Sequence, residues 1–123
     1  MRNARLVLVL LFVLVSIFNM PNAVFAENTI NIKVVLSENN GENPIVYYFK
    51  LGSDTNYTLL ELMQRKFIIE HDNGFITSIQ DRAASNKDKT AWMYTINGEM
   101  AMVGAAEYQI KNGDEFHWDL RKW

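Results

Sequence analysis

AWMYTINGEM, residues Ala91 to Met100, is the stretch of the sequence that decides the fold. Its Asn97-Gly98 dipeptide lies between two runs of β-prone residues. A type I′ turn requires positive φ at both central residues, and Asn and Gly adopt that conformation at the least cost. The dipeptide therefore predicts a tight β-hairpin in which each run forms one strand.

Both faces of this predicted hairpin are largely apolar. One face would carry Trp92, Tyr94, Ile96, Glu99, Ala101 and Val103, and the other Met93, Thr95, Met100 and Met102. A small antiparallel sheet commonly buries one face and leaves the other in water. Side-chain size favours the tryptophan face as the core, which would leave the methionines outside. The second apolar face therefore predicts a surface that contacts an apolar ligand or a protein partner.

The first 26 residues have the pattern of a secretory signal peptide. Two arginines precede an apolar run from Leu6 to Phe18, and Val24 and Ala26 supply the small residues that a signal peptidase recognises. As a helix, this run would extend about 20 Å, short of the ~30 Å hydrocarbon core. We therefore expect cleavage after Ala26 and a secreted domain of residues 27–123, extracellular or in the cell envelope, without stable membrane insertion. An uncleaved anchor is the alternative.

The composition of the remaining chain limits its partners. Without the two signal-peptide arginines, 10 basic residues stand against 14 acidic residues, a net charge of −4. An acidic domain without basic clusters is poorly suited to nucleic acid or to anionic membranes. The sequence has no cysteine, which excludes thiol catalysis and thiolate metal sites and leaves folding to the packing of one core.

Two strands and a helix are predicted before the hairpin. Alternating apolar residues indicate strands over 30–36 and 45–51. Thr58-Leu-Leu-Glu61 fits a capping box at the start of a helix. The buried stripe of this helix would consist of Leu59, Leu60, Met63 and Phe67.

The order of the elements predicts the fold class. After the helix we expect a turn at 71–74, a short strand over 75–79, a polar loop over 80–90, the hairpin, and a closing strand from Phe116. A helix that follows a first hairpin can cross one face of a mixed sheet. The sequence therefore predicts an α+β fold of β-grasp type, with one helix packed on one face of the sheet.

Few residues are suited to catalysis or to metal binding. His71 lies in a predicted turn, His117 lies on the polar face of the closing strand, and neither recurs at ligand spacing. No serine lies in a Gly-x-Ser-x-Gly elbow, and the glycines read as turn residues. We expect no catalytic residue, no metal site and no required cofactor. An enzyme that uses His71 or His117 is the weakest alternative.

Five motifs in order resemble the C-terminal domain of the transcobalamin and intrinsic factor carriers and the related stand-alone bacterial domains. The motifs are TLLELM (58–63), GFITSI (74–79), W-x-Y (92–94) before Asn-Gly, GAAEY (104–108) and NGDEF (112–116). Together they extend from Thr58 into the closing strand. The order and spacing carry the resemblance, since each motif alone is common.

The resemblance implies a β-grasp-like domain that caps one face of a corrin ring, with cobalamin as the bound ligand. In the carriers a separate helical domain holds the other face; we expect it to be absent here, so that a lone cap binds more weakly. Carried over by motif, the residues near the ligand would be Ile76, Thr77, Ser78, Tyr94, Met100, Ala101 and Met102.

Two functions are compatible with these observations. The first is a secreted, noncatalytic module that binds a small ligand of corrinoid type on the apolar hairpin surface. The second is an extracellular protein-interaction module that accompanies a separate surface or transport protein of the envelope. In the second case, an exposed strand of the domain would add to the partner.

Overall fold

The structure is a computed structural model that describes residues 28–54 and 56–123, so the predicted signal peptide and its cleavage site lie outside the described residues. Five strands form one sheet, in the order β2-β1-β8-β6-β7. Their bounds are β1 (Thr29–Glu38), β2 (Glu42–Gly52), β6 (Thr90–Ile96), β7 (Glu99–Met100) and β8 (Glu115–Lys122). Among the described strands only β1 and β8 pair in parallel, so the sheet is mixed.

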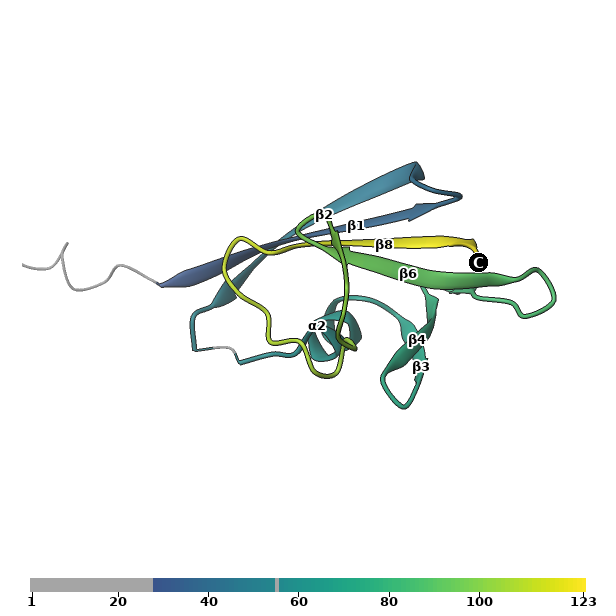
Figure 1. Cartoon of the computed structure of the whole chain (residues 1–123). Coiled ribbons are helices and arrows are strands. Elements are labelled where there is room, and N and C mark those ends of the chain that lie inside the picture. Colours follow the sequence, from purple (N-terminus) through teal and green to yellow (C-terminus); the bar gives the residue numbers. More distant parts are fainter. Residues whose placement is uncertain (1–27, 55) are drawn as a thin grey trace, which may run out of the picture.

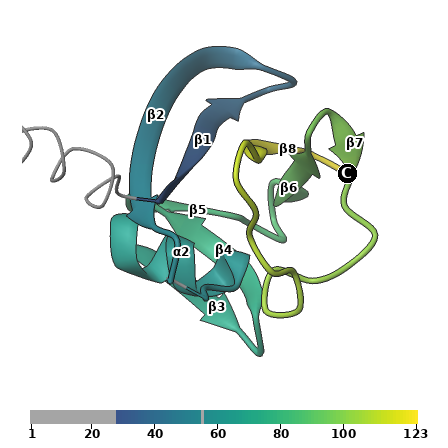
Figure 2. The same ribbon diagram turned by 90° about the vertical axis from the view of Figure 1, so that its left-hand side faces the viewer.

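A second layer lies against one face of this sheet. It consists of α2 (Leu59–Lys66) and a smaller sheet of β3 (Ile69–Asp72), β4 (Phe75–Ile79) and β5 (Arg82–Ala83), in the order β3-β4-β5. Both parts lie on the same side of the large sheet in Figure 1, and the turned view in Figure 2 shows the same two layers. No described element covers the opposite face. The predicted α+β class, with one helix on one face, is confirmed.

The hydrophobic core fills the space between the two layers. Alternate residues of β1 point toward α2, and Val34 is aligned with Tyr47 on β2 and with Phe116 on β8. The buried side chains come from both layers and include Ile32, Val34, Leu59, Leu62, Met63, Ile79, Phe116 and Trp118. Burying each such side chain contributes roughly 1.5–3 kcal/mol, which offsets part of the conformational entropy lost on folding.

The helix begins where the sequence predicts. The Thr58 side chain accepts a hydrogen bond from the Glu61 N–H at 3.2 Å, and the Glu61 carboxylate accepts one from the Thr58 N–H at 3.4 Å. The predicted buried stripe is partly wrong, because Leu62 is fully buried and Leu60 is only half-buried. The helix ends at Lys66, since Phe67 has extended backbone angles.

The hairpin forms with the predicted turn and register. Asn97 and Gly98 have φ of 52° and 85°, and the pairs are Ile96 with Glu99 and Thr95 with Met100. The expectation that the second strand continues to residue 103 is wrong, because β7 ends at Met100.

After β7 the chain leaves the hairpin and forms hydrogen bonds with the start of the helix. The Leu60 and Leu59 N–H groups donate to the carbonyls of Ala105 and Tyr108, each at 2.9 Å. The first N–H groups of a helix have no partner within the helix. The segment after β7 satisfies them, and in doing so it crosses from the sheet layer to the helix layer.

Two strands of the small sheet, β3 and β5, were not predicted from the sequence. The segment predicted to turn the chain at 71–74 begins as the end of β3, and its turn is confined to Asn73-Gly74. The segment predicted to be a loop over 80–90 contains the two-residue strand β5. Strands this short lack a readable period and form because β4 pairs with both.

Candidate functional site

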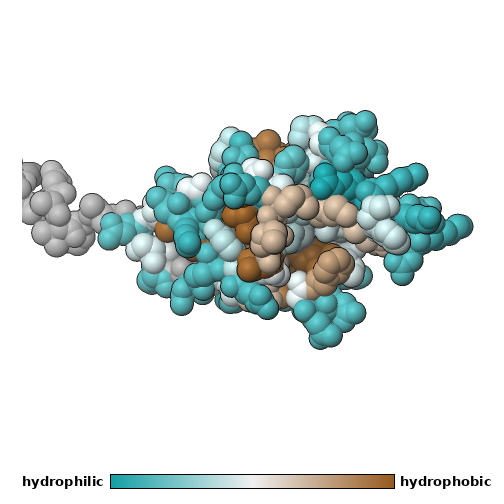
Figure 3. Space-filling view, in the orientation of Figure 1, coloured by the Kyte–Doolittle hydropathy of each residue, from teal (hydrophilic) through white to brown (hydrophobic). Residues whose placement is uncertain are grey.

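An apolar cavity of about 330 Å³ opens on the helix side of the hairpin. Its walls come from β4, β6, β8 and the segment 103–107. Apolar surface gathers on this side of the molecule in the space-filling view of Figure 3. The cavity exists because β7 is short, since the segment after Met100 departs from the sheet and leaves the hairpin face open.

Tyr94 forms one wall of this cavity. Its ring stacks on Trp118, with ring centroids 4.2 Å apart and planes inclined by 24°. Its hydroxyl donates to the Val103 carbonyl at 2.5 Å. Burial and, second, the charge of Glu107 raise the pKa of Tyr94, so the hydroxyl keeps its proton at neutral pH. Tyr94 therefore joins β6 to the segment that closes the cavity.

The chemistry of the walls suits an amphipathic molecule. Phe75, Ile76 and Trp92 supply apolar contact, while Asn73 and Glu107 place polar groups at the rim. Small-molecule sites typically combine a large apolar lining with a few polar groups that fix orientation. The cavity can therefore hold the apolar edge of a ligand and hydrogen-bond its polar fringe.

Two of the predicted ligand contacts meet in this cavity. Ile76 and Tyr94 both line it, from β4 and β6. Thr77 instead borders a neighbouring hollow of about 430 Å³, and Ser78 is buried in β4. Successive residues of a strand point to opposite faces, so consecutive strand residues cannot all face one ligand.

The other three predicted contacts lie outside the cavity. Met100 and Met102 are 56% and 93% exposed, and neither lines it. Ala101 is half-buried and donates its N–H to the Tyr94 carbonyl at 3.3 Å. The structure therefore separates the predicted set into a cavity pair and a group at the hairpin end.

Several cavity residues were not predicted from the sequence. Phe75 is 62% exposed at the mouth, and Val103 and Glu107 form the far wall. A signal existed, since Phe75 belongs to the GFITSI motif and Glu107 to the GAAEY motif. The sequence did not predict the position of segment 103–107, because that position depends on hydrogen bonds with the N-terminus of the helix.

The uncovered face of the large sheet carries a polar network beside exposed apolar side chains such as Val46 and Tyr48. The Ser37 hydroxyl donates to Asp119 Oδ1 at 2.7 Å and lies 2.6 Å from His117 Nε2. His117 lies on the polar face of β8, as the sequence predicts, but it is half-buried beside β1, the parallel neighbour of β8.

This network does not have the geometry of a nucleophile triad. Ser37 is 1% exposed, and its single proton goes to Asp119, so it cannot also donate to His117. An activated nucleophile must be reachable and must lose its proton to the neighbouring base.

The other histidine, His71, is exposed, and its Nδ1 accepts a hydrogen bond from the Gly74 N–H at 3.0 Å.

Within residues 28–54 and 56–123, no group of three or more metal-ligating His, Cys, Asp or Glu side chains lies together. No helix in the same range is long and apolar enough to cross a membrane.

The fold and the site define a small two-layer α+β domain with an apolar cavity of ligand size beside its hairpin. The chain belongs to the family described as Domain of unknown function (DUF4430), whose match covers residues 56–122, from just before α2 through β8. No protein of curated function matches the sequence.

Two solved structures share the fold. A candidate metal-binding protein from Ruminococcus gnavus ATCC 29149 superposes with a TM-score of 0.59 at 20% identity, over 76% of this chain and 98% of that chain. Haptocorrin in complex with Cbi superposes with a TM-score of 0.57 at 21% identity, over 78% of this chain. The matched part is 26% of haptocorrin. At this identity the two likenesses establish the fold.

Proposed function

We propose that the domain is a secreted, noncatalytic binding module whose cavity beside Tyr94 takes the rim of a bulky small molecule, a corrinoid being the first candidate. The observation that carries the proposal is the cavity itself, which Ile76 and Tyr94 line together. The parallel pair β1 and β8 at the centre of the sheet, with α2 on one face, supports assignment to the β-grasp type.

The size of the cavity limits the mode of binding. A corrinoid is larger than the drug-sized ligands that pockets of about 300–1,000 Å³ enclose. A cavity of about 330 Å³ would receive one edge of such a ligand and leave the rest in solvent. Binding through one edge gives modest affinity, because less contact offsets the same loss of translational and rotational freedom.

The likeness to haptocorrin supports the choice of ligand. Haptocorrin was crystallised with Cbi, cobinamide, and the part that superposes on this chain has the same fold. A second surface, on another protein or another copy, would complete the enclosure of the ligand. The signal-peptide pattern of residues 1–26 supports an extracellular or envelope location for this binding.

Equilibrium dialysis against cobinamide tests the proposal without interference from the absorbance of the corrin. Ala106 is exposed and lines the cavity, so Ala106→Phe should occupy the space and weaken binding by at least about tenfold. Ala83→Phe adds the same side chain on β5, away from the cavity walls, and should bind like the unmodified protein.

Two results would reject the corrinoid assignment. One is the absence of any retained ligand at hundreds of micromolar cobinamide. The other is equal binding by the Ala106→Phe and Ala83→Phe variants, which would place the ligand elsewhere. Tryptophan fluorescence gives a second readout, since Trp92 and Trp118 line the cavity.

A protein-interaction module is the second candidate, and the edge strand β2 favours it. In the described sheet β2, a strand of eleven residues, pairs with β1 alone. Its exposed apolar side chains are Ile45, Val46 and Tyr48. An exposed edge strand is a template to which a partner can add a strand.

The two candidates separate in one capture experiment on the exported fraction of the producing cells. A stoichiometric partner that is retained without added corrinoid, is lost with Val46→Lys and is kept with Ala106→Phe favours the interaction module. Capture that requires cobinamide and is lost with Ala106→Phe favours the ligand-binding module.

A further inference from the structure

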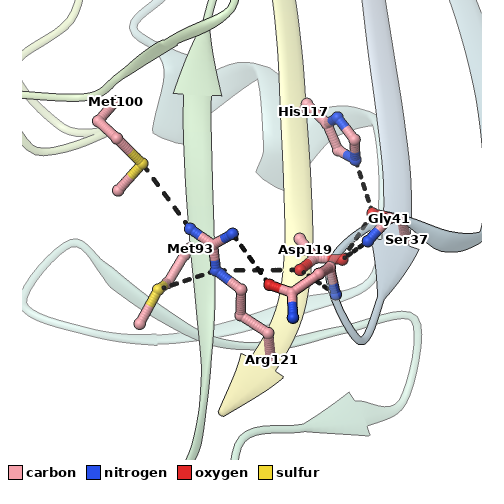
Figure 4. A network of polar contacts seen from close by, with 8 residues as sticks. Ser37, Gly41, Met93, Met100, His117, Asp119 and Arg121 are labelled. Atoms are coloured by element: carbon pink, nitrogen blue, oxygen red, sulfur yellow. Dashed lines mark hydrogen bonds and ion pairs between the residues drawn. The ribbon is translucent and has the colours of Figure 1, made fainter. Parts of the chain in front are cut away.

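A second cavity lies on the face of the large sheet that α2 does not cover. It measures about 180 Å³ and is bordered by Met93 and Thr95 of β6, by His117, Asp119 and Arg121 of β8, and by the turn at Asn40-Gly41. Figure 4 shows Met93, Met100 and Asp119 around the guanidinium of Arg121, while His117 points to Ser37. The apolar cavity lies on the helix side of the same strands, and Tyr94 of β6 borders both cavities.

The carboxylate nearest to Arg121 is already engaged by other donors. Asp119 accepts the Ser37 hydroxyl at 2.7 Å and the N–H groups of Asn40 and Gly41, each at 3.0 Å. Its distance to Arg121 Nε is 4.0 Å, at the limit of an ion pair. Asp119 therefore holds the β1–β2 turn, and the charge of Arg121 is poorly compensated.

The remaining contacts of Arg121 are with two thioether sulfurs and one neutral amide oxygen. Nε donates to the Met93 sulfur at 3.2 Å, Nη2 lies 3.8 Å from the Met100 sulfur, and Nη1 lies 3.3 Å from the Asn40 side-chain oxygen. A thioether is a weak acceptor, whereas a guanidinium makes its strongest hydrogen bonds with an oxyanion. An incoming anion would displace the thioethers at little cost, because methionine side chains are flexible.

We propose that Arg121 anchors a second binding site, specific for a compact organic carboxylate. The guanidinium fork matches the two oxygens of a carboxylate, and Thr95 and His117 supply further polar groups on the cavity wall. The single charge of Arg121 lies beside the negative charge of Asp119, which repels a dianion more strongly than a monoanion. The site therefore discriminates against phosphate.

Nuclear magnetic resonance titration of the full chain with sodium propionate tests this proposal. We expect saturable shifts of the Arg121 Nε–H and of the Thr95 and Gly41 amides, with a dissociation constant of roughly millimolar, as a bidentate pair of charge-assisted hydrogen bonds allows. Sodium chloride at equal ionic strength should leave these signals in place. Phosphate should bind more weakly than propionate.

Three variants connect the shifts to the guanidinium. Arg121→Gln should weaken propionate binding at least about tenfold, and Arg121→Lys should give an intermediate loss, because it keeps the charge without the fork. Arg65→Gln is the matched control, since Arg65 lies over the Tyr57 ring in the helix layer and should not affect binding.

Several results would overturn the proposal. Absence of propionate-dependent shifts at Arg121 in the unmodified protein does so without any variant. Equal shifts with chloride, tighter binding of phosphate than of propionate, or unchanged binding in a folded Arg121→Gln variant would each do so as well.

Discussion

Tyr94 lies on Trp118 with ring centroids 4.2 Å apart, and this stack holds the Tyr94 hydroxyl against the Val103 carbonyl. The pair thereby connects two neighbouring strands of the sheet to the segment that closes the apolar cavity. The shape of the cavity depends on this connection, because Val103 belongs to no strand.

Replacing Tyr94 by Phe should remove one hydrogen bond and keep the aromatic stack. We expect the free energy of unfolding in urea to fall by about 0.5–1.5 kcal/mol, and amide exchange at Gly104 and Glu107 to become faster. Tyr48→Phe is the control, since Tyr48 is 77% exposed and should unfold like the unmodified protein. Equal effects of the two substitutions would contradict the role assigned to the hydroxyl.

Replacing Asp119 by Asn should destabilise the β1–β2 turn. The carboxylate accepts three hydrogen bonds, from Ser37, Asn40 and Gly41. The NH2 group of an amide cannot accept a hydrogen bond, so at least one of these donors would lose its acceptor. We expect a loss of about 2–4 kcal/mol in the free energy of unfolding. Glu115→Gln removes an exposed carboxylate that pairs with Lys33 and should cost at most about 1 kcal/mol. Similar losses for both would count against this account.

Replacing Thr58 by Ala should weaken the start of the helix. The substitution removes the side-chain acceptor for the Glu61 N–H, and we expect a loss of about 1 kcal/mol in the free energy of unfolding. Thr58→Ser keeps a hydroxyl at the cap and should restore most of that stability. Chemical denaturation followed by circular dichroism measures both. Equal stability of the two variants would show that the cap contributes nothing.

Stability should fall in alkaline solution over a defined range. Burial, the hydrogen bond to Asp114 and the charge of Asp114 raise the pKa of Tyr108 from 10.0 to about 12. Between these two values the unfolded chain has lost the phenol proton and the folded chain has kept it. The free energy of unfolding should therefore be steady for this group below pH 10 and decrease as pH rises toward 12.

Urea unfolding at a series of alkaline pH values, with tyrosinate absorbance as a second readout, measures this dependence. Tyr108→Phe should make the decline shallower. A smaller decline should remain, because the pKa of Tyr94 is also raised. An unchanged pH dependence in Tyr108→Phe would assign the effect to other groups.

Local features were predictable from the sequence because they depend on neighbouring residues. The capping box at Thr58 and Glu61 uses groups three residues apart, and the Asn97-Gly98 turn needs only positive φ at two adjacent positions. Period-two alternation likewise predicted β1, β2 and β8, since alternate side chains of a strand face opposite sides. The α+β class follows from the order of these elements.

The sites depend on contacts between distant parts of the chain. Ser37 and Asp119 are 82 residues apart and meet because β1 and β8 pair in parallel. The small sheet required pairing of strands too short to carry a period. The face that stays accessible was predicted only in part. The helix covers one face, as expected, but the apolar cavity opens on that covered side.

By itself the sequence determined the turns, the helix start and the alternating strands, because short-range sterics and hydrogen bonds set them. The tertiary structure decided where the segment after β7 goes. The N–H groups of Leu59 and Leu60 have no acceptor within the helix, and they donate to the carbonyls of Tyr108 and Ala105. That contact between helix and loop ends the hairpin early and opens the cavity beside Tyr94, and no local pattern encodes it.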